Sequence, residues 1–419
     1  MRKMKDSGVA WIGVIPENWQ LLSVGALFKV RNEKVNDTDY PPLSVTKGGI
    51  VPQMESVAKS DATDNRKMVL KNDFVINSRS DRKQSCGVSP LDGSVSLINT
   101  VLYPVPNAPV LPDYLDYLLK NYGFAEEFYR WGHGIVADLW TTRWQEMKNI
   151  FLPIPPVEEQ QKIIFSISTQ MGKVDALIAN VQEQIEKLKA YKQSLITEVV
   201  TKGLDPDAPM KDSGVEWIGS IPAHWELPRI KNLFRLRNER NDEADLSKVN
   251  LISLYTDLGV VQHSDIIETT GNRAVTAEGY KFVHRNDIVV NIILCWMGAV
   301  GMSKYDGVTS PAYDIYCPIN ETISEYYHYL FRTRRFNGEC YRYGKGIMMM
   351  RWRTYSTEFR AITVPYPPVD EQKGIVDYLN KKCAGIDKLI SIKQSKIEKL
   401  EQYKRSLIYE YVTEKKEVP

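Results

Sequence analysis

Two segments of the chain carry the side chains that proteins use to read base edges. Residues 77–84, Asn-Ser-Arg-Ser-Asp-Arg-Lys-Gln, follow a short apolar run, and a second group lies within residues 341–353. Arginine, lysine, asparagine and glutamine hydrogen-bond base edges in the major groove of DNA. The candidate DNA-binding residues are Arg79, Arg82, Lys83, Gln84, Arg342, Lys345, Arg351 and Arg353. Taken singly, each of them is more simply explained as a solvated residue of a loop or helix face.

The sequence offers no comparable set of residues for catalysis or metal binding. Residues 40–43, Tyr-Pro-Pro-Leu, have the wrong flanks for the Asp/Asn-Pro-Pro-aromatic motif of adenine methyltransferases. The Gly-His-Gly and Gly-Lys-Gly segments at 132–134 and 344–346 are too short for a cofactor loop, and no phosphate-binding loop occurs. The five histidines lack metal-ligand spacing. We therefore expect no catalytic residue, no metal site and no cofactor bound by this chain.

The composition is that of an ordinary globular protein. The chain has 419 residues, of which 43% are hydrophobic and 25% charged, and a net charge of +2 that argues neither for nor against nucleic acid. Five cysteines without a CxxC pair indicate reduced thiols. The most apolar run, residues 287–297, is too short to cross a bilayer and predicts a buried strand. With no recognisable signal peptide, we expect a cytoplasmic protein without a membrane partner.

The elements that position the candidate residues occur twice. Residues 4–19 return as residues 210–225, and the proline-rich segment 153–160 returns as 365–372. Between these, residues 71–77 align with 285–291, residues 129–135 align with 341–347, and Trp140 aligns with Trp352. The remaining residues of the two halves are largely unrelated. We expect the shared positions to form a scaffold and the differing positions to determine what each half recognises.

Each repeat ends in a heptad pattern. Apolar residues recur at alternating spacings of three and four after each Pro-Pro pair, as far as Val199 in the first half and Tyr411 in the second. This pattern predicts two helices of about forty residues, roughly 60 Å long, that pair as a coiled coil. Antiparallel pairing is expected, because it needs no long return connection. Lys192, Lys393 and Lys404 interrupt the stripe and are expected at the edge of the seam.

The expected fold is therefore mixed α/β (α+β), with a pseudo-twofold internal repeat. Two globular recognition domains, residues 1–152 and 203–364, alternate with two long helical spacers, residues 153–202 and 365–419. The apolar runs at 74–76 and 289–290 predict strands, and residues 113–119 and 325–331 predict short amphipathic helices. The expected scaffold and partner-docking residues are Trp11, Trp19, Trp217, Trp225, Leu188, Tyr191, Leu195, Leu400, Tyr403 and Leu407.

Three features of the sequence resemble the specificity subunits of type I restriction-modification systems. They are the opening segment 212–225, the Pro-Pro-Val-Glu/Asp-Glu-Gln helix starts at 155–160 and 367–372, and the order domain, helix, domain, helix. The resemblance covers essentially the whole chain. It implies that each domain reads one half of a split, asymmetric target in double-stranded DNA, and that the helices fix the gap.

The resemblance also implies partners. Two methylation subunits would dock on the scaffold and methylate an adenine in each half-site, and restriction subunits would add ATP-dependent cleavage. S-adenosylmethionine, ATP and Mg²⁺ would be bound by those partners. Two alternatives stay open, namely a DNA methyltransferase or nuclease with an unrecognised site, and a structural adaptor whose domains bind proteins.

Overall fold

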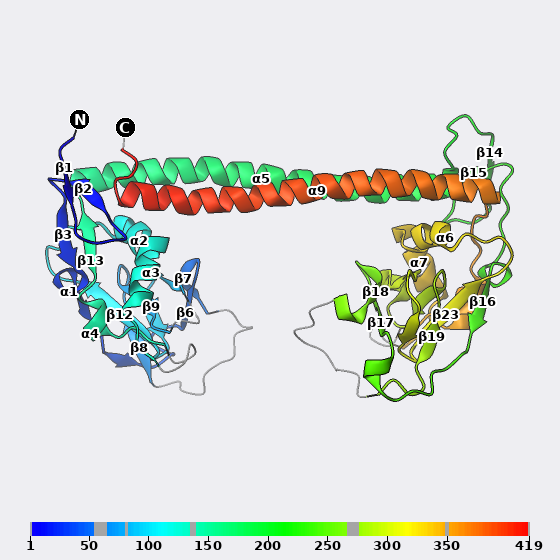
Figure 1. Cartoon of the computed structure of the whole chain (residues 1–419), viewed down its shortest axis with the longest axis horizontal. Coiled ribbons are helices and arrows are strands. Elements are labelled where there is room, and N and C mark those ends of the chain that lie inside the picture. Colours follow the sequence, from blue (N-terminus) through cyan, green and yellow to red (C-terminus); the bar gives the residue numbers. More distant parts are fainter. Residues whose placement is uncertain are drawn as a thin grey trace. The chain divides into compact units, whose positions relative to one another are not determined.

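The chain folds into two compact units, shown in the computed structural model of Figure 1. The structure describes residues 2–53, 65–79, 83–134, 140–265, 276–347 and 352–417. One unit consists of Met1–Gln182 with Gln394–Pro419, and the other of Glu183–Lys393. Each unit thus contains one globular domain and one part of each long helix. The candidates Arg82 and Arg351 lie outside the described residues.

An antiparallel four-stranded sheet, in the order β10-β9-β12-β4, forms the centre of the first domain. Its strands are β4 (Phe28–Val30), β9 (Phe74–Asn77), β10 (Cys86–Val88) and β12 (Asn99–Pro104). A layer of short strands comprises β5 (Lys34–Val35), β6 (Leu43–Thr46), β7 (Gly49–Pro52), β8 (Arg66–Val69) and β11 (Gly93–Val95). The helices are α1 (Val24–Leu27), α2 (Pro112–Lys120), α3 (Tyr122–Arg130) and α4 (Trp144–Met147).

The second domain repeats this plan with the sheet order β16-β23-β20-β21. Its strands are β16 (Phe234–Arg237), β20 (Ile288–Asn291), β21 (Val300–Met302) and β23 (Tyr313–Pro318). Further strands are β17 (Ile252–Tyr255), β18 (Gly259–Gln262), β19 (Lys281–Val283) and β22 (Gly307–Thr309). The helices are α6 (Ser324–Phe331), α7 (Arg334–Tyr343) and α8 (Ser356–Ala361), and the 3-10 helices are η3 (Ile230–Asn232), η4 (Leu246–Lys248), η5 (His263–Asp265) and η6 (Cys295–Met297).

Small antiparallel pairs open each domain and lead into its long helix. The opening repeat forms β1 (Met4–Asp6) with β2 (Val14–Pro16), and again β14 (Met210–Asp212) with β15 (Ser220–Pro222). In the first domain β3 (Gln20–Ser23) also pairs with β13 (Phe151–Ile154), the strand before the Pro-Pro pair. The repeated sequence therefore folds into a repeated structure.

The central strand of each sheet is buried on both faces. In β9, Phe74 and Ile76 pack in the core that includes the helices, whereas Val75 packs among the short strands. In β20, Ile288 and Val290 face the helical core, and Val289 faces the short strands. Because successive side chains of a strand point to opposite faces, a strand between two layers is apolar throughout. The predicted strands at 74–76 and 289–290 and the predicted helices at 113–119 and 325–331 are thus confirmed.

One prediction is wrong in its extent. The apolar run 287–297 is a strand only over Ile288–Asn291. The side-chain oxygen of Asn291 accepts hydrogen bonds from the backbone N–H groups of Ile293 (2.9 Å) and Leu294 (3.2 Å), which turns the chain out of the sheet. The rest of the run forms a loop that contains η6.

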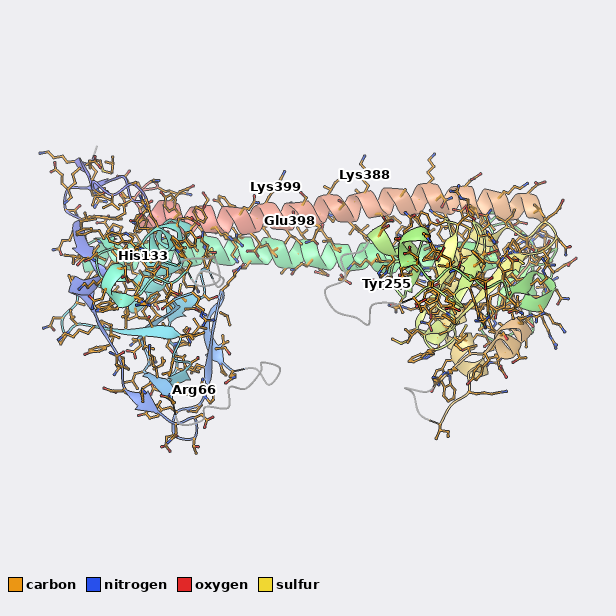
Figure 2. All side chains as sticks on the ribbon, turned by 60° about the horizontal axis from the view of Figure 1, so that its bottom comes forward. Arg66, His133, Tyr255, Lys388, Glu398 and Lys399 are labelled. Carbon is orange, nitrogen blue, oxygen red and sulfur yellow. The ribbon has the colours of Figure 1, made fainter. Side chains whose placement is uncertain are left out.

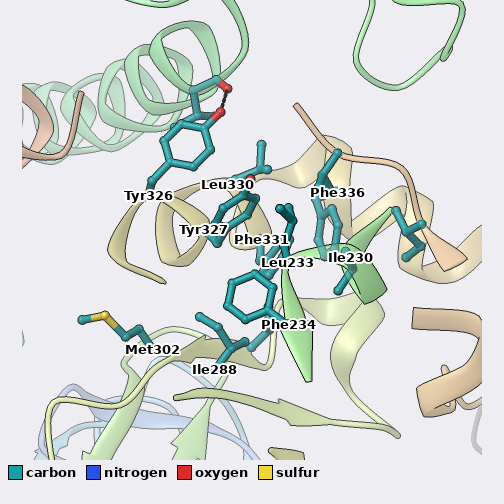
Figure 3. Packing of buried hydrophobic residues seen from close by; sticks show 14 of the residues in the cluster. Ile230, Leu233, Phe234, Ile288, Met302, Tyr326, Tyr327, Leu330, Phe331 and Phe336 are labelled. Atoms are coloured by element: carbon teal, nitrogen blue, oxygen red, sulfur yellow. Dashed lines mark hydrogen bonds between the residues drawn. The ribbon is translucent and has the colours of Figure 1, made fainter. Parts of the chain in front are cut away.

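The core of the second domain is rich in aromatic rings (Figure 3). Phe331 stacks on Phe336 with ring centroids 4.5 Å apart, and Phe234 meets Tyr327 edge-on at 5.2 Å. The hydroxyl of Tyr326 donates to the backbone carbonyl of Val200 over 2.7 Å. This buried hydrogen bond ties the domain to the end of the first long helix.

The two long helices are α5 (Val157–Lys202) and α9 (Val369–Val412), of 46 and 44 residues. They lie side by side within each unit (Figure 1). Antiparallel direction is evident within the second unit alone, where Lys393 contacts Gln184 at 2.5 Å and Lys192 contacts Asp387 at 2.7 Å. Buried residues of the α5 stripe include Val174, Ile178, Val181 and Ile185. Lys388 and Lys399 project from α9 and are exposed (Figure 2).

The lysines that interrupt the stripe lie at the edge of the seam, as expected, and each bonds the opposite helix. Lys404 contacts Asp175 at 2.5 Å in the first unit, which matches the two contacts of the second unit. No helix among the described residues is both long enough and apolar enough to cross a membrane.

A glutamine fixes the start of each long helix to its domain. The amide nitrogen of Gln160 donates to the carbonyls of Pro109 and Pro155, both at 2.8 Å, and its oxygen accepts from the backbone of Leu111. Gln372 likewise donates to Pro367 (2.9 Å) and accepts from Ile323 (3.1 Å). Both glutamines are fully buried. Because these bonds join the helix to the loop before α2 or α6, they fix where each helix leaves its domain.

Candidate nucleic-acid interface

The first group of candidate residues lies on the loop that follows β9. Arg79, Lys83 and Gln84 all line one small cavity, of about 20 Å³, together with Tyr129 and Trp140. That volume has room for roughly one water molecule. The cavity is therefore a packed base for the loop rather than a ligand pocket.

Within this group the basic side chains differ in their surroundings. The Lys83 ammonium lies 2.7 Å from a carboxylate oxygen of Glu126 and 4.3 Å from the centre of the Tyr129 ring. Arg79 is exposed, and its backbone N–H donates to the side chain of Asn77 over 3.0 Å. Gln84 adopts a φ of +64°, in the left-handed region. Arg79 is thus the described residue of this loop best placed to meet a ligand.

Each domain contains a repeated arrangement of a tyrosine, a glycine and a tryptophan, which we call the aromatic clasp. It lies beside the loop after β9 in the first domain and beside the loop after β20 in the second. It consists of Tyr129, Gly132 and Trp140 in the first domain and of Tyr341, Gly344 and Trp352 in the second. The rings stack with centroids 5.6 Å apart in the first clasp and 4.9 Å in the second. Each tryptophan donates its indole N–H to the carbonyl of its tyrosine, over 2.9 and 3.0 Å.

The glycines of the clasp are required by space. A Cβ at Gly132 would lie 2.3 Å from the indole nitrogen of Trp140, and one at Gly344 would lie 2.2 Å from that of Trp352. Reciprocal backbone hydrogen bonds join His133 to Thr141 in the first domain and Lys345 to Arg353 in the second. The residues that align between the two halves at these positions therefore form the same set of hydrogen bonds in each domain.

The second group of candidates lies around the second clasp. Arg342 makes a bidentate ion pair with the buried carboxylate of Glu339, at 2.5 and 2.8 Å, and this hydrogen bonding raises the arginine pKa. Arg130 pairs with Glu127 at the equivalent place of the first domain. Because the pair is repeated, it belongs to the scaffold. Lys345 is ion-paired with Glu358 at 2.5 Å.

Arg353 is the remaining described candidate of this group. Its backbone pairs with that of Lys345, at 2.8 and 2.9 Å, and its side chain is partly buried. The structure thus brings Arg342, Lys345 and Arg353 together at the base of one loop. Which of them contacts DNA stays a prediction.

The expected scaffold residues separate into a buried and an exposed set. Trp11, Trp19, Trp217 and Trp225, with Leu195 and Leu407, are buried, and Leu188 and Leu400 are partly buried. Tyr191 and Tyr403 occupy equivalent positions of the two helices, and 56% and 45% of their surfaces are exposed. Each pair of tryptophans therefore stabilises the core of its own domain, whereas the two tyrosines are accessible to a partner.

A second repeated ion pair was not among the predicted residues. Arg31 donates to both carboxylate oxygens of Asp73, at 2.7 and 3.1 Å, and Arg237 does the same to Asp287, at 2.9 and 3.2 Å. Both aspartates are buried, and the hydrogen bond to Asp73 raises the pKa of Arg31. The signal is present in the sequence, because Arg31-Asn32-Glu33 returns as Arg237-Asn238-Glu239 and the two aspartates stand in the aligned segments 71–77 and 285–291.

The part of the chain that the structure describes contains no cluster of metal-binding side chains. No three histidine, cysteine, aspartate or glutamate side chains there gather closely enough to hold an ion. The five cysteines, Cys86, Cys295, Cys317, Cys340 and Cys383, are free and buried. Burial raises the pKa of Cys86 to about 12, which keeps that thiol protonated.

Known proteins have sequences similar to this chain. The putative type I restriction enzyme MjaX specificity subunit of Methanocaldococcus jannaschii is 22% identical over 95% of this chain and 93% of its own length. The MjaVIII specificity subunit of the same organism is 24% identical over 62% of this chain and 61% of its own. No family model matches the chain.

The fold is also known from a solved structure. A chain from the solved assembly of a type I restriction-modification system covers 95% of this chain and 98% of its own length, with a TM-score of 0.64 and 14% identity. The predicted fold of two mixed domains with two paired long helices is thereby confirmed. The relatives and the shared fold together confirm the resemblance of this chain to the specificity subunits of type I restriction-modification systems.

Proposed function

We propose that this chain is the subunit that determines the DNA sequence recognised by a type I restriction-modification complex. The observation that carries the proposal is that the two domains share one scaffold and differ at equivalent loops. The buried Arg–Asp pair, the clasp and the helix-anchoring glutamine all occur twice. The loops that follow β9 and β20, residues 78–84 and 292–298, have different sequences. Two different readers on one scaffold suit a split, asymmetric target.

In this proposal the chain itself catalyses nothing. Methylation subunits dock on the paired helices and methylate an adenine in each half-site, with S-adenosylmethionine as donor. Restriction subunits bind ATP and Mg²⁺ and cleave DNA. The complex acts in the cytoplasm, where its DNA substrate lies. The exposed Tyr191 and Tyr403, repeated at the same heptad position, support a pair of equivalent docking sites.

The long helices act as the spacer between the half-sites. Removing one heptad from α5 and the facing heptad from α9 would shorten each helix by about 10 Å. The unread gap in the target should shorten accordingly, by about 3 base pairs. An unchanged gap in a complex that still methylates DNA would contradict the spacer role.

The decisive experiment maps methylated adenines across the genome of the source cell, with and without this gene. We expect a split motif that disappears on deletion and returns with the intact gene. Methylation that persists after deletion would contradict the proposal. A purified chain that transfers methyl groups without partners would also contradict it and would favour a methyltransferase.

A single substitution tests the division between the domains. Arg79→Ala should weaken recognition of one half-site, because Arg79 is exposed on the loop after β9 of the first domain. Direct base contacts are worth about 1–3 kcal/mol of discrimination. Competition with duplexes altered in one half-site at a time measures the effect. Equal weakening for every sequence would instead assign Arg79 to the phosphate backbone.

A further inference from the structure

The loop that carries Arg79 has a structural counterpart in the second domain. Residues 78–84 lie in the connection from β9 to β10, and residues 292–298 lie in the connection from β20 to β21. The backbone N–H of Asn77 donates to Ser85 over 2.9 Å, and that of Asn291 donates to Ala299 over 3.0 Å. Each loop ends at a residue of positive φ, Gln84 at +64° and Gly298 at +95°. The two loops therefore have the same length and the same closed base.

Each loop is hydrogen-bonded to the threonine that lies two residues after the tryptophan of its clasp. Thr142 donates its backbone N–H to Ser78 over 3.2 Å, and Thr354 donates to Ile292 over 2.9 Å. In the second domain Trp296 also meets the clasp residue Tyr341 edge-on, with ring centroids 5.8 Å apart. The loop of residues 292–298 thus stands at the place where the first domain carries its basic candidates.

The chemistry of the two loops is opposite. The first reads Ser-Arg-Ser-Asp-Arg-Lys-Gln, and the second reads Ile-Ile-Leu-Cys-Trp-Met-Gly. In the second loop Cys295 is fully buried, whereas Leu294 is 37% and Met297 is 50% exposed. The two large side chains that this loop exposes are therefore both apolar, and neither packs in the hydrophobic core.

An apolar side chain on a DNA-reading loop has a specific counterpart in the major groove. Thymine presents a methyl group there, and it is the apolar mark that distinguishes a T·A pair. We infer, on the basis of the proposed function, that Leu294 and Met297 recognise a thymine methyl group in the half-site of the second domain. The first domain reads its half-site through polar side chains at the equivalent place.

Replacement of thymidine by deoxyuridine tests this inference, because it removes only the methyl group. The specificity chain, assembled with its methylation subunits, is titrated with duplexes that carry the replacement in one half-site at a time. We expect binding about 3- to 10-fold weaker when the half-site of the second domain is replaced. Replacement in the other half-site should change binding less than twofold.

Two variants connect the effect to the loop. Met297→Ala and Leu294→Ala should each weaken binding to thymidine duplexes and reduce the penalty for deoxyuridine. Leu258→Ala is the matched control, because Leu258 is an exposed leucine of the same domain (61%) at the β17–β18 turn. It should leave the deoxyuridine penalty unchanged.

The outcomes distinguish this inference from the proposed function. A half-site without a T·A pair, or one indifferent to deoxyuridine in the wild-type complex, would overturn the thymine contact while sequence-selective binding persisted. An apolar wedge between base steps would give variants that lose DNA bending but keep the deoxyuridine penalty, and that result also overturns it. Loss of sequence selectivity in the wild-type complex would instead contradict the proposed function.

Discussion

Arg237 donates from Nε and from a terminal guanidinium nitrogen to the two carboxylate oxygens of Asp287, at 2.9 and 3.2 Å. Only 2% of the Asp287 side chain is exposed, and the residue immediately precedes the central strand β20. Asp287 also accepts the backbone N–H of His284 over 2.9 Å. One carboxylate therefore joins β16 to the turn that leads into β20.

Removal of this carboxylate should destabilise the second domain strongly. Asp287→Ala leaves the Arg237 guanidinium partly buried without its main partner, which costs about 3–5 kcal/mol. Glu239→Ala is the control, because Glu239 pairs with the same arginine but is 57% exposed, so solvent screens that ion pair and its loss should cost much less stability. Thermal and urea unfolding of both variants measures the difference. Similar losses in the two variants would show that burial of the pair is unimportant.

The aromatic clasps should act on one half-site each. Trp352→Ala removes the stack on Tyr341 and the indole hydrogen bond, so the segment that they close loses its fixed base. We expect roughly tenfold weaker discrimination in the half-site of the second domain and little change in the other, and the converse for Trp140→Ala. Methylation of duplexes altered in single half-sites measures this.

Phenylalanine separates the two parts of the clasp. Trp352→Phe keeps the stack and loses only the hydrogen bond, which contributes about 1 kcal/mol. It should retain most of the discrimination. If Trp352→Ala weakened both half-sites alike, the clasp would be part of general folding rather than of positioning.

Acid should destabilise the second domain through His328. Burial, with help from the nearby Arg332 and Lys304 charges, lowers the His328 pKa from 6.5 to about 3. Its Nδ1 accepts the backbone N–H of Met302 over 3.1 Å, so the neutral ring is the form that fits. Between these two pKa values the unfolded chain binds a proton that the folded chain does not. The contribution of neutral His328 to the free energy of unfolding is therefore complete above pH 6.5 and is lost as the pH falls toward 3.

The size of this effect can be measured. Between about pH 7.5 and pH 5 the loss should be roughly 2 kcal/mol of unfolding free energy. His328→Gln keeps an acceptor for Met302 and removes the titration, so its stability should depend less on pH over that interval. Identical pH profiles for the variant and the wild type would contradict the assignment to His328.

The exposed tyrosines of the helices should be docking residues. Tyr191→Ala and Tyr403→Ala should each weaken binding of one methylation subunit by about 10-fold, since a large aromatic side chain is lost from an interface. The double variant should bind neither subunit well. Lys399→Ala is the control, because Lys399 is exposed on the same helix as Tyr403. Titration calorimetry or native mass spectrometry gives the stoichiometry, and unchanged binding would exclude these positions.

The parts of the fold that repeat were the parts that the sequence could predict. The heptads, the opening motif and the strands around Val75 and Val289 rest on periodicity and on direct duplication, which need no knowledge of tertiary contacts. The extent of the strand within 287–297 could not be predicted, because apolarity alone does not reveal that the Asn291 side chain ends the strand. The tertiary environment, and not hydropathy, decides that Leu294 is exposed.

The sequence predicts the candidate DNA-binding residues by their type, but it does not predict the ion pairs that these residues make in the folded chain. The sequence predicts Arg342 and Lys345 as basic residues of a loop, yet each has an acidic partner within its own domain. The Glu-x-x-Arg spacing of Glu339 and Arg342 recurs at Glu127 and Arg130 and could have identified a helical pair. The pairing of Lys345 with Glu358 joins two separate elements, and no local spacing predicts it.

The equal length of the loops 78–84 and 292–298 has a consequence for engineering. Each begins after an asparagine at the end of a central strand and returns through a residue of positive φ to the next strand. A seven-residue segment exchanged between the domains would keep the flanking strands, but it must carry an apolar side chain at position 295, because Cys295 packs in the core of the second domain. Position 294 and position 297 are exposed, so the residues that contact a ligand can be varied there while the core residue between them is kept.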